Sequence, residues 1–187
     1  MVRQVNIVPT SLSGAVIVQT RNIEDERGAF RRLFCDSELE PIVGQRKVVQ
    51  VNQSRTKHVG AVRGMHFQRQ PHAETKFIRC LRGRVWDVAV DLRKDSPTFL
   101  RWHAEILSPE NGHMFVVPEG CAHGFQVLEP DSELLYLHTA YYEPSAEGGV
   151  RHDDPLVGIE WPLEIVQLSQ RDQSYPLLTS NFYGITV

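Results

Sequence analysis

Two histidines stand in segments whose residue types suit chemistry. His66 lies in RGMHFQ at 63–68, and His123 lies in PEGCAHGF at 118–125. The unperturbed pKa of imidazole lies near neutral pH, so a histidine can act there as a general base, especially when a carboxylate fixes its tautomer. Three roles are open for His66: metal ligand, proton acceptor, or packed and hydrogen-bonded residue.

A metal site is one interpretation of these segments. Metal-binding cupins offer an HxH pair, a nearby glutamate and a later PxGxxH segment, and Pro118 to His123 has the last of these. The first histidine pair is incomplete, because Gln68 stands where the second histidine would be. An amide is a weak transition-metal ligand, although two histidines with Glu74 could still form a facial triad.

Proton transfer next to a carbonyl group is the favoured interpretation. Abstracting such a proton needs a base and a group that stabilises the developing enolate oxygen, for which a lysine ammonium is suited. A tyrosine could return the proton to the opposite face of the carbon. His66, Lys76, Tyr136 and an aspartate would form such a set.

The cysteines offer a weaker alternative. Cys35, Cys80 and Cys121 are odd in number and contain no CxxC pair, which predicts free thiols in a reducing cytoplasm. Cys121 lies close to His123 in sequence, so a thiolate nucleophile is conceivable. A small buried residue is the more common state of such a cysteine.

Composition limits the classes of partner. A net charge of −3 gives no field that would attract nucleic acid or an anionic membrane, so local Arg and Lys must bind any anionic ligand. The N-terminus lacks the features of a signal peptide, and no window approaches the roughly 18 apolar residues of a membrane span. We expect a cytoplasmic protein without nucleic-acid or membrane partners.

The elements that would position these residues are strands. In RVWDVAVDLR, Trp86, Val88 and Val90 alternate with Asp87 and Ala89, which is the period of a strand. Further short candidates are separated by turn signals: KFIRCLRG, HAEILS, HMFVVPEG, GFQVLE and ELLYLHTAYY. Such spacing without long helices predicts an antiparallel sandwich or barrel in one domain. A short helix is predicted near 36–44, and a helix or turn after residue 163.

A series of ordered motifs resembles a known family. The motifs are DERGAFRR (25–32), VVQVNQS (48–54), AVRGMHFQ (61–68), KFIRCLRGRVWDVAVDLRKDSPTF (76–99), VPEGCAHGFQVL (117–128), LLYLHTAYYEP (134–144), DDPLVGIEWPL (153–163) and LSQRD (168–172). Together they resemble dTDP-4-dehydrorhamnose 3,5-epimerases over about residues 15–176. The resemblance implies an all-β, cupin-type jelly roll (a double-stranded β-helix) with short peripheral helices. It also implies a single domain over 1–187, a homodimer, and no metal or other cofactor.

The implied reaction is epimerisation at C3 and C5 of a dTDP-4-keto-6-deoxy-hexose. By position, His66 resembles the family's base and Asp172 the carboxylate paired with it. Lys76 resembles the residue beside the keto oxygen, and Tyr136 the proton donor on the far face.

The resemblance also implies a set of substrate-binding residues. Arg27 and Arg171 resemble contacts of the nucleotide diphosphate, and Tyr142 and Phe30 resemble surfaces that stack on thymine. The full set is Arg27, Phe30, Gln50, Asn52, Arg63, His123, Tyr142, Glu147 and Arg171.

The chain departs from the family pattern in places. Arg31 and Arg32 stand where an aromatic residue and a glutamate are usual, which reverses a charge at the nucleotide end. Thr75 replaces a glycine before Lys76, and we expect the nearby His72 and Glu74 to be solvated loop residues.

Other roles stay open. Arg63 could instead pair with Asp87 or Asp91, while His103 and His138 are interpreted as surface or core residues. The alternative functions are a 3- or 5-only epimerase, a 3,4-keto-isomerase, a metal-dependent cupin and a non-catalytic nucleotide-sugar binding module.

Overall fold

The computed structural model describes residues 5–187, so residues 1–4 of the predicted domain lie outside it. The described chain is mostly strand, and its helices are short: α1 (Asp36–Val43), the 3₁₀ turn η1 (Pro144–Ala146) and α2 (Gln170–Ser174). The helix predicted near 36–44 is therefore confirmed, as is helical structure after residue 163. Within residues 5–187 no helix has the length and apolar character needed to cross a membrane.

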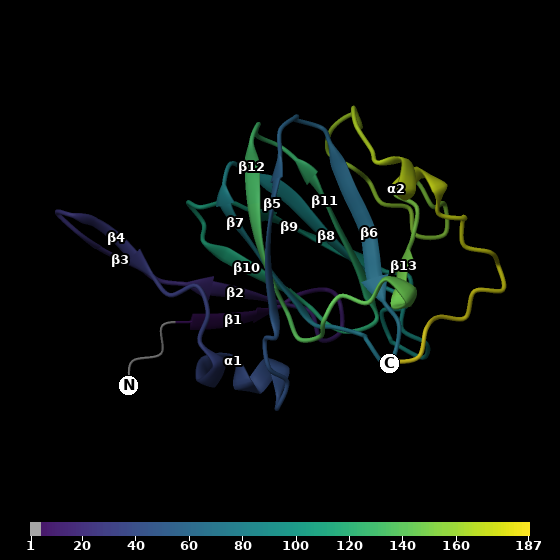
Figure 1. The fold of residues 1–187 in the computed structure, drawn as a ribbon, viewed down its shortest axis with the longest axis horizontal. Coiled ribbons are helices and arrows are strands. Elements are labelled where there is room, and N and C mark those ends of the chain that lie inside the picture. Colours follow the sequence, from purple (N-terminus) through teal and green to yellow (C-terminus); the bar gives the residue numbers. More distant parts are fainter. Residues whose placement is uncertain (1–4) are drawn as a thin grey trace.

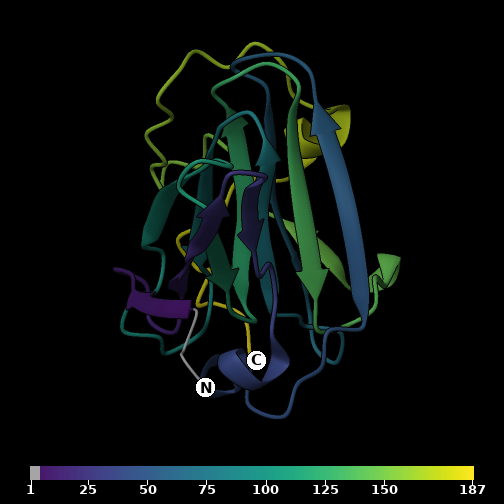
Figure 2. The ribbon, with the colours of Figure 1, turned by 90° about the vertical axis from the view of Figure 1, so that its left-hand side faces the viewer.

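Two antiparallel sheets face each other (Figures 1 and 2). The six-stranded sheet has the order β1 (Val5–Pro9), β2 (Val16–Thr20), β10 (His113–Val117), β7 (Lys76–Arg82), β12 (Ser132–His138), β5 (Gln50–Thr56). The five-stranded sheet has the order β13 (Glu147–Gly149), β6 (Val62–Gln68), β11 (Cys121–Val127), β8 (Val85–Asp91), β9 (Trp102–Leu107). This arrangement confirms the predicted all-β jelly roll, and the predicted strand segments all lie in it.

The alternation predicted for β8 is confirmed, and both of its faces are buried. Val88 and Val90 belong to a hydrophobic cluster on the outer face of the five-stranded sheet. Ala89 faces the other way, into the core between the two sheets, and Asp87 and Asp91 on the same face are fully buried. An interior that accepts carboxylates among apolar residues can hold a polar site.

The outer face of each sheet has its own cover. On the six-stranded sheet, Leu39 and Val43 of α1 pack on side chains that include Phe77 of β7. On the five-stranded sheet, Val157 and Trp161 from the segment after β13 complete the outer cluster. These covers bury the outer faces of the sheets, and the inner faces form the core between them.

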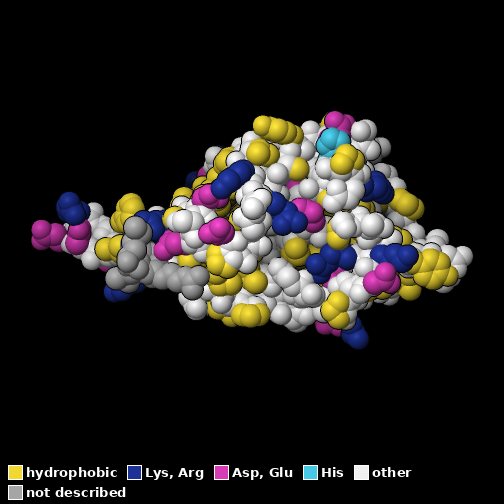
Figure 3. All heavy atoms as spheres, turned by 90° about the horizontal axis from the view of Figure 1, so that it is seen from below, with side chains coloured by type: hydrophobic (Ala, Val, Ile, Leu, Met, Phe, Trp, Pro, Cys, Tyr) yellow, Lys and Arg dark blue, Asp and Glu magenta, His cyan; other side chains and the backbone are white. Residues whose placement is uncertain are grey.

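A separate hairpin extends away from the sheets. It consists of β3 (Asn22–Asp25) and β4 (Gly28–Arg31), which pair with each other in a two-stranded sheet of their own. Figures 1 and 3 show it standing clear of the body, and Figure 3 shows acidic, basic and hydrophobic side chains close together towards its end. Ile23 and Phe30 are exposed there.

Candidate active site

A polar cavity lies between the sheets, with walls supplied by both. This inner cavity of about 270 Å³ is lined by residues of β5, β6, β7, β11, β12 and α2: Asn52, Gln53, Ser54, Arg63, His66, Lys76, His123, Phe125, Tyr136, His138 and Arg171. Alternation along β7 turns Lys76 inward, since Ile78 and Cys80 on the same face belong to the core between the sheets. Seven predicted site residues therefore line this cavity: His66, Lys76, Tyr136, Asn52, Arg63, His123 and Arg171.

His66 is paired with a buried carboxylate. Its Nε2 lies 2.7 Å from Oδ1 of Asp172, whose side chain is 3% exposed. Burial raises the pKa of Asp172. The hydrogen bond and the charge of His66, together with the hydrogen bond from the Gly64 N–H, outweigh burial and leave this pKa below its usual value. Asp172 is therefore an ionised acceptor, Nε2 carries a proton, and Nδ1 is the nitrogen left to take one.

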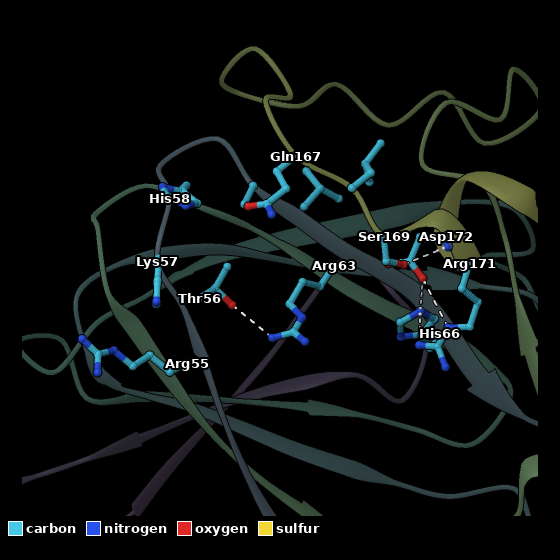
Figure 4. Close-up of a pocket in the computed structure, with 13 residues that line it drawn as sticks. Arg55, Thr56, Lys57, His58, Arg63, His66, Gln167, Ser169, Arg171 and Asp172 are labelled. Atoms are coloured by element: carbon cyan, nitrogen blue, oxygen red, sulfur yellow. Dashed lines mark hydrogen bonds and ion pairs between the residues drawn. The ribbon is translucent and has the colours of Figure 1, made fainter.

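The short helix α2 positions the Asp172 carboxylate. In LSQRD, Ser169 caps α2 by accepting a hydrogen bond from the Asp172 N–H at 3.0 Å. Arg171, next to it, has Nη2 3.1 Å from His66 Nε2 (Figure 4) and donates from Nη1 to both oxygens of Glu147 at 3.0 Å. One short helix therefore brings an anion and a cation to the same imidazole.

Glycine is required in RGMHFQ because two backbones approach closely. Gly64 has φ +124°, and a Cβ there would lie 2.5 Å from Cα of Gly124 and 2.8 Å from O of His123. A Cβ on Gly124 would in turn lie 2.7 Å from O of Arg63. This close contact sets β6 against β11 beside His66 and leaves the Gly64 N–H 3.3 Å from Oδ2 of Asp172.

Lys76 lies across the cavity from the pair. Its Nζ donates to O of His66 at 3.1 Å and forms an ion pair of 3.3 Å with Glu74. The prediction that Glu74 is a solvated loop residue is wrong, because Glu74 is 9% exposed. Nothing in the sequence pattern indicated that the charges of Lys76 and Glu74 would pair with each other inside the barrel.

Tyr136 reaches the cavity from β12. Its hydroxyl lies 3.0 Å from the Ser54 hydroxyl, and its ring meets the ring of His123 edge-on at 6.1 Å. Burial is the main reason that the pKa of Tyr136 is raised. The phenol therefore stays protonated at neutral pH and has a proton to give.

His123 forms a second histidine–carboxylate pair deeper in the barrel. Its Nε2 lies 2.9 and 3.0 Å from the two oxygens of Asp87, and burial raises the pKa of that carboxyl. Asp91 is bonded instead to Arg93. The alternative that Arg63 pairs with Asp87 or Asp91 is therefore wrong: Arg63 donates to the Thr56 hydroxyl at 3.3 Å (Figure 4).

An adjoining outer cavity of about 350 Å³ holds more of the predicted residues. Gln50, Tyr142 and Glu147 line it, and Tyr142 donates its hydroxyl hydrogen to Glu147 at 3.0 Å. Gln50 accepts a hydrogen bond from the Tyr142 N–H, also at 3.0 Å. An open aromatic surface next to a polar cavity can receive a flat ring.

Two predicted binding residues are not in either cavity. Arg27 and Phe30 lie on the β3–β4 hairpin, where the Arg27 side chain is 84% exposed and bonded to Asp25. Arg31 and Arg32, which replace the aromatic residue and glutamate usual in the family, have partners within the chain. Arg31 donates to O of Pro109, and Arg32 forms an ion pair with Glu38 on α1.

The alternative chemistries have less support in the geometry. Among residues 5–187 no three His, Cys, Asp or Glu side chains lie together as a metal would require. Cys121 is 3% exposed within the core between the sheets, and burial raises the pKa of its thiol to about 12. A thiolate at that position would not form near neutral pH.

Sequence reasoning missed four residues of the inner cavity: Gln53, Ser54, Phe125 and His138. Ser54 and His138 both face it, and period-two alternation from Asn52 and Tyr136 was the signal that could have found them. Next to the inner cavity, a larger one of about 490 Å³ shares Arg63, His66 and Arg171 and is also lined by Arg55, Lys57 and His58 (Figure 4).

Fold and site together define a cupin-like jelly-roll protein with histidine–carboxylate pairs in its interior. Residues 9–180 match the family described as dTDP-4-dehydrorhamnose 3,5-epimerase. The chain is 41% identical to the enzyme of that name from Salmonella typhimurium over 174 residues, which are 92% of this chain and 94% of the relative. The chain belongs to the dTDP-4-dehydrorhamnose 3,5-epimerase family.

Solved structures agree with this assignment. The dTDP-4-dehydrorhamnose 3,5-epimerase from Elizabethkingia anophelis superposes with a TM-score of 0.90 at 37% identity, covering 96% of this chain and 100% of that one. The dTDP-6-deoxy-D-glucose-3,5-epimerase from Legionella pneumophila, in complex with dTDP-4-keto-L-rhamnose, gives 0.88 at 40% identity, covering 92% of each chain.

Proposed function

We propose that the protein epimerises C3 and C5 of a dTDP-linked 4-keto-6-deoxy-hexose by proton transfer, without a metal or organic cofactor. The observation that carries this proposal is the placement of His66 and Tyr136 on facing sheets across one cavity. A base on one wall and an acid on the other can remove a proton from one face of a carbon and return it to the opposite face.

Each residue has a defined task in this mechanism. The C4 ketone acidifies the hydrogens on both neighbouring carbons. His66 takes a proton at Nδ1 while Asp172 holds the ring and stabilises the imidazolium at Nε2. Lys76 stabilises the developing enolate oxygen, and Tyr136 then donates its hydroxyl proton to the carbon from the other side. The same groups act on C3 and C5 in turn.

The two cavities suit the two halves of such a substrate. The inner cavity would hold the sugar, with Arg63 and His123 as contacts, and the outer cavity would hold the nucleotide against Tyr142. The complex of the Legionella relative with dTDP-4-keto-L-rhamnose supports a dTDP-linked ligand.

We also propose a homodimer, because it gives the hairpin a function. Arg27 and Phe30 stand clear of their own cavities, and the exposed Phe30 and Ile23 would be covered by a second protomer (Figure 3). A hairpin that reaches the partner's outer cavity would supply the diphosphate contact and the second stacking surface. A cytoplasmic location is part of the same proposal and rests on the three unpaired cysteines.

Deuterium exchange tests the reaction directly. In D₂O, dTDP-4-keto-6-deoxyglucose should gain deuterium at C3 and C5 in the presence of the dialysed protein, as measured by NMR or mass spectrometry. His66→Asn should abolish exchange at both carbons, a loss of at least about 10²-fold for a general base. Exchange no faster than without protein would reject the proposal, and label at one carbon alone would identify a mono-epimerase. Exchange retained by His66→Asn at either carbon would show that another base acts there.

A further inference from the structure

The inner and outer cavities meet at a junction of four shared residues: Asn52, His66, Lys76 and His138. A ligand that occupies both cavities must pass these side chains. In a nucleotide sugar, the part between the sugar and the nucleoside is a diphosphate. The mechanism uses His66 and Lys76, whereas His138 so far has no task.

The ring of His138 is held on two sides. Its Nδ1 lies 2.9 Å from Oε2 of Glu74, and its ring stacks on Tyr136 with centroids 6.2 Å apart and planes at 25°. The opposite ring nitrogen, Nε2, lies 3.4 Å from Nδ2 of Asn52, another junction residue. Glu74 can only accept a hydrogen bond while ionised, so Nδ1 carries the proton and Nε2 is presented to the junction.

Glu74 keeps its charge in this position. Burial raises the pKa of its carboxyl, but the hydrogen bond from His138 and the nearby Lys76 outweigh burial, and the pKa is lowered overall. The ionisable groups around His138 are Glu74, Lys76 of β7 and Tyr136 of its own strand, while β5 presents the neutral Asn52 and Gln50. Across the two cavities stand His66, Arg171 and Glu147.

A carboxylate on one ring nitrogen favours the charged imidazolium, and an anion at the other nitrogen would favour it further. We infer that His138 is a ligand-binding residue that donates from Nε2, in its protonated form, to a phosphoryl oxygen of the nucleotide sugar, with Glu74 as its counter-ion. This inference rests on the proposed function and adds a diphosphate contact within the same protomer. Binding should therefore draw a proton from solution.

Calorimetry can measure that proton. The probe is dTDP-glucose, whose phosphates are both esterified and do not titrate near neutral pH, titrated at about pH 7 in buffers of different ionisation enthalpy. We expect net proton uptake by the wild type. His138→Gln should reduce the uptake and raise the dissociation constant about tenfold, the effect of one charge-assisted hydrogen bond. Glu74→Gln should also reduce the uptake.

A matched control lies elsewhere in the chain. His113 has the same kind of bond, from Nδ1 to Oε1 of Glu105 at 2.8 Å, and lines neither cavity. His113→Gln should leave uptake and affinity unchanged. The inference would be overturned if His138→Gln kept the proton uptake and the affinity of the wild type. It would also be overturned if His66→Asn were the only variant to lose the proton uptake.

Two further outcomes also decide the inference. If His138→Gln does not fold, ¹⁵N imidazole signals of the wild type replace it: Nε2 of His138 should become protonated when dTDP-glucose is added, and an unchanged signal contradicts the inference. Failure of the wild type to bind dTDP-glucose would overturn both this inference and the nucleotide half of the proposed function. Normal binding without uptake would overturn the inference alone, and deuterium exchange would still report the reaction.

Discussion

At the scale of single residues, the side chains of His66 and Tyr136 have different surroundings. His66 has a carboxylate on one nitrogen and keeps the other for chemistry, and Asp172 stays ionised because donors surround it. Tyr136 has no carboxylate partner and is kept protonated by burial. The proposed base and the proposed acid thus line one cavity.

The roles of base and acid can be separated by substitution. We expect Tyr136→Phe to retain deuterium exchange at C3 and C5, because His66 still removes the proton. Inversion should fall by about 10²-fold, since no group donates from the opposite face. Product stereochemistry by NMR checks this expectation, and an unchanged ratio of epimers would assign the donor elsewhere. Tyr141, exposed on the surface, provides the control Tyr141→Phe.

Acid should destabilise the fold through Glu74. The folded pKa of Glu74 is lowered, so its contribution to stability is present above its unfolded pKa of about 4.3 and is lost as pH falls through the folded pKa. Glu74→Gln should therefore lower the free energy of unfolding at neutral pH, and the difference from wild type should shrink towards about pH 3. Urea unfolding across this range measures it, with the exposed Glu160→Gln as control. A difference independent of pH would show that packing, not charge, is responsible.

Some of these residues could be predicted from sequence, and the reasons are local. Alternation in β8 and the motif order were enough to orient Val88 and Asp87 and to name His66 and Tyr136. Glu74 was missed because its partner His138 is 64 residues away in sequence and is brought to it by the pairing of β12 with β7. The position of Arg27 was missed because a strand pattern says nothing about the direction in which a hairpin leaves the body.

At the scale of elements, the pairing of β6 with β11 positions His66, the proposed base. His66 lies opposite His123 in the register, and Gly64 and Gly124 let the two backbones approach next to them. The carboxylate of Asp172 takes a hydrogen bond from the same stretch of β6. The position of the base therefore depends on an absent side chain two residues away.

Two glycines of similar φ isolate the effect of this contact. Gly64 has φ +124° with backbone atoms within 3 Å of the place that a Cβ would occupy, whereas Gly28 on the hairpin has φ +132° and open space. Both alanine variants carry backbone strain, but Gly64→Ala should cost about 1–3 kcal/mol more because strands must separate. Thermal unfolding should show the difference, and exchange activity should fall in Gly64→Ala. Equal melting temperatures would mean that the strands adjust freely.

At the scale of the whole molecule, the hairpin is the feature that a lone protomer does not explain. It pairs only with itself within the described chain and carries Arg27 and Phe30 into solvent. The proposed dimer turns these residues into contacts of a partner's cavity.

Mixing two inactive variants tests this arrangement. One protein carries His66→Asn with an intact hairpin, and the other carries Arg27→Ala and Phe30→Ala with an intact His66. If each hairpin serves the partner's cavity, mixed dimers regain one complete site, and exchange should recover to about a quarter of the wild-type value after random mixing. Absence of recovery in dimers shown to be mixed would place the hairpin residues in their own protomer's site or in none.

Gln68 gives the barrel interior a constraint of another kind. Its amide, 4% exposed, donates to O of His72 and O of Tyr141 and accepts from the Glu143 N–H at 2.7 Å. It thereby ties together the two loops that border the outer cavity, one of which carries Tyr142. A histidine at this position could complete the HxH pair of a metal site but would lose these hydrogen bonds of the Gln68 amide to the two loops. Gaining the metal ligand would therefore also mean rebuilding the rim of the outer cavity, where we propose that the nucleotide binds.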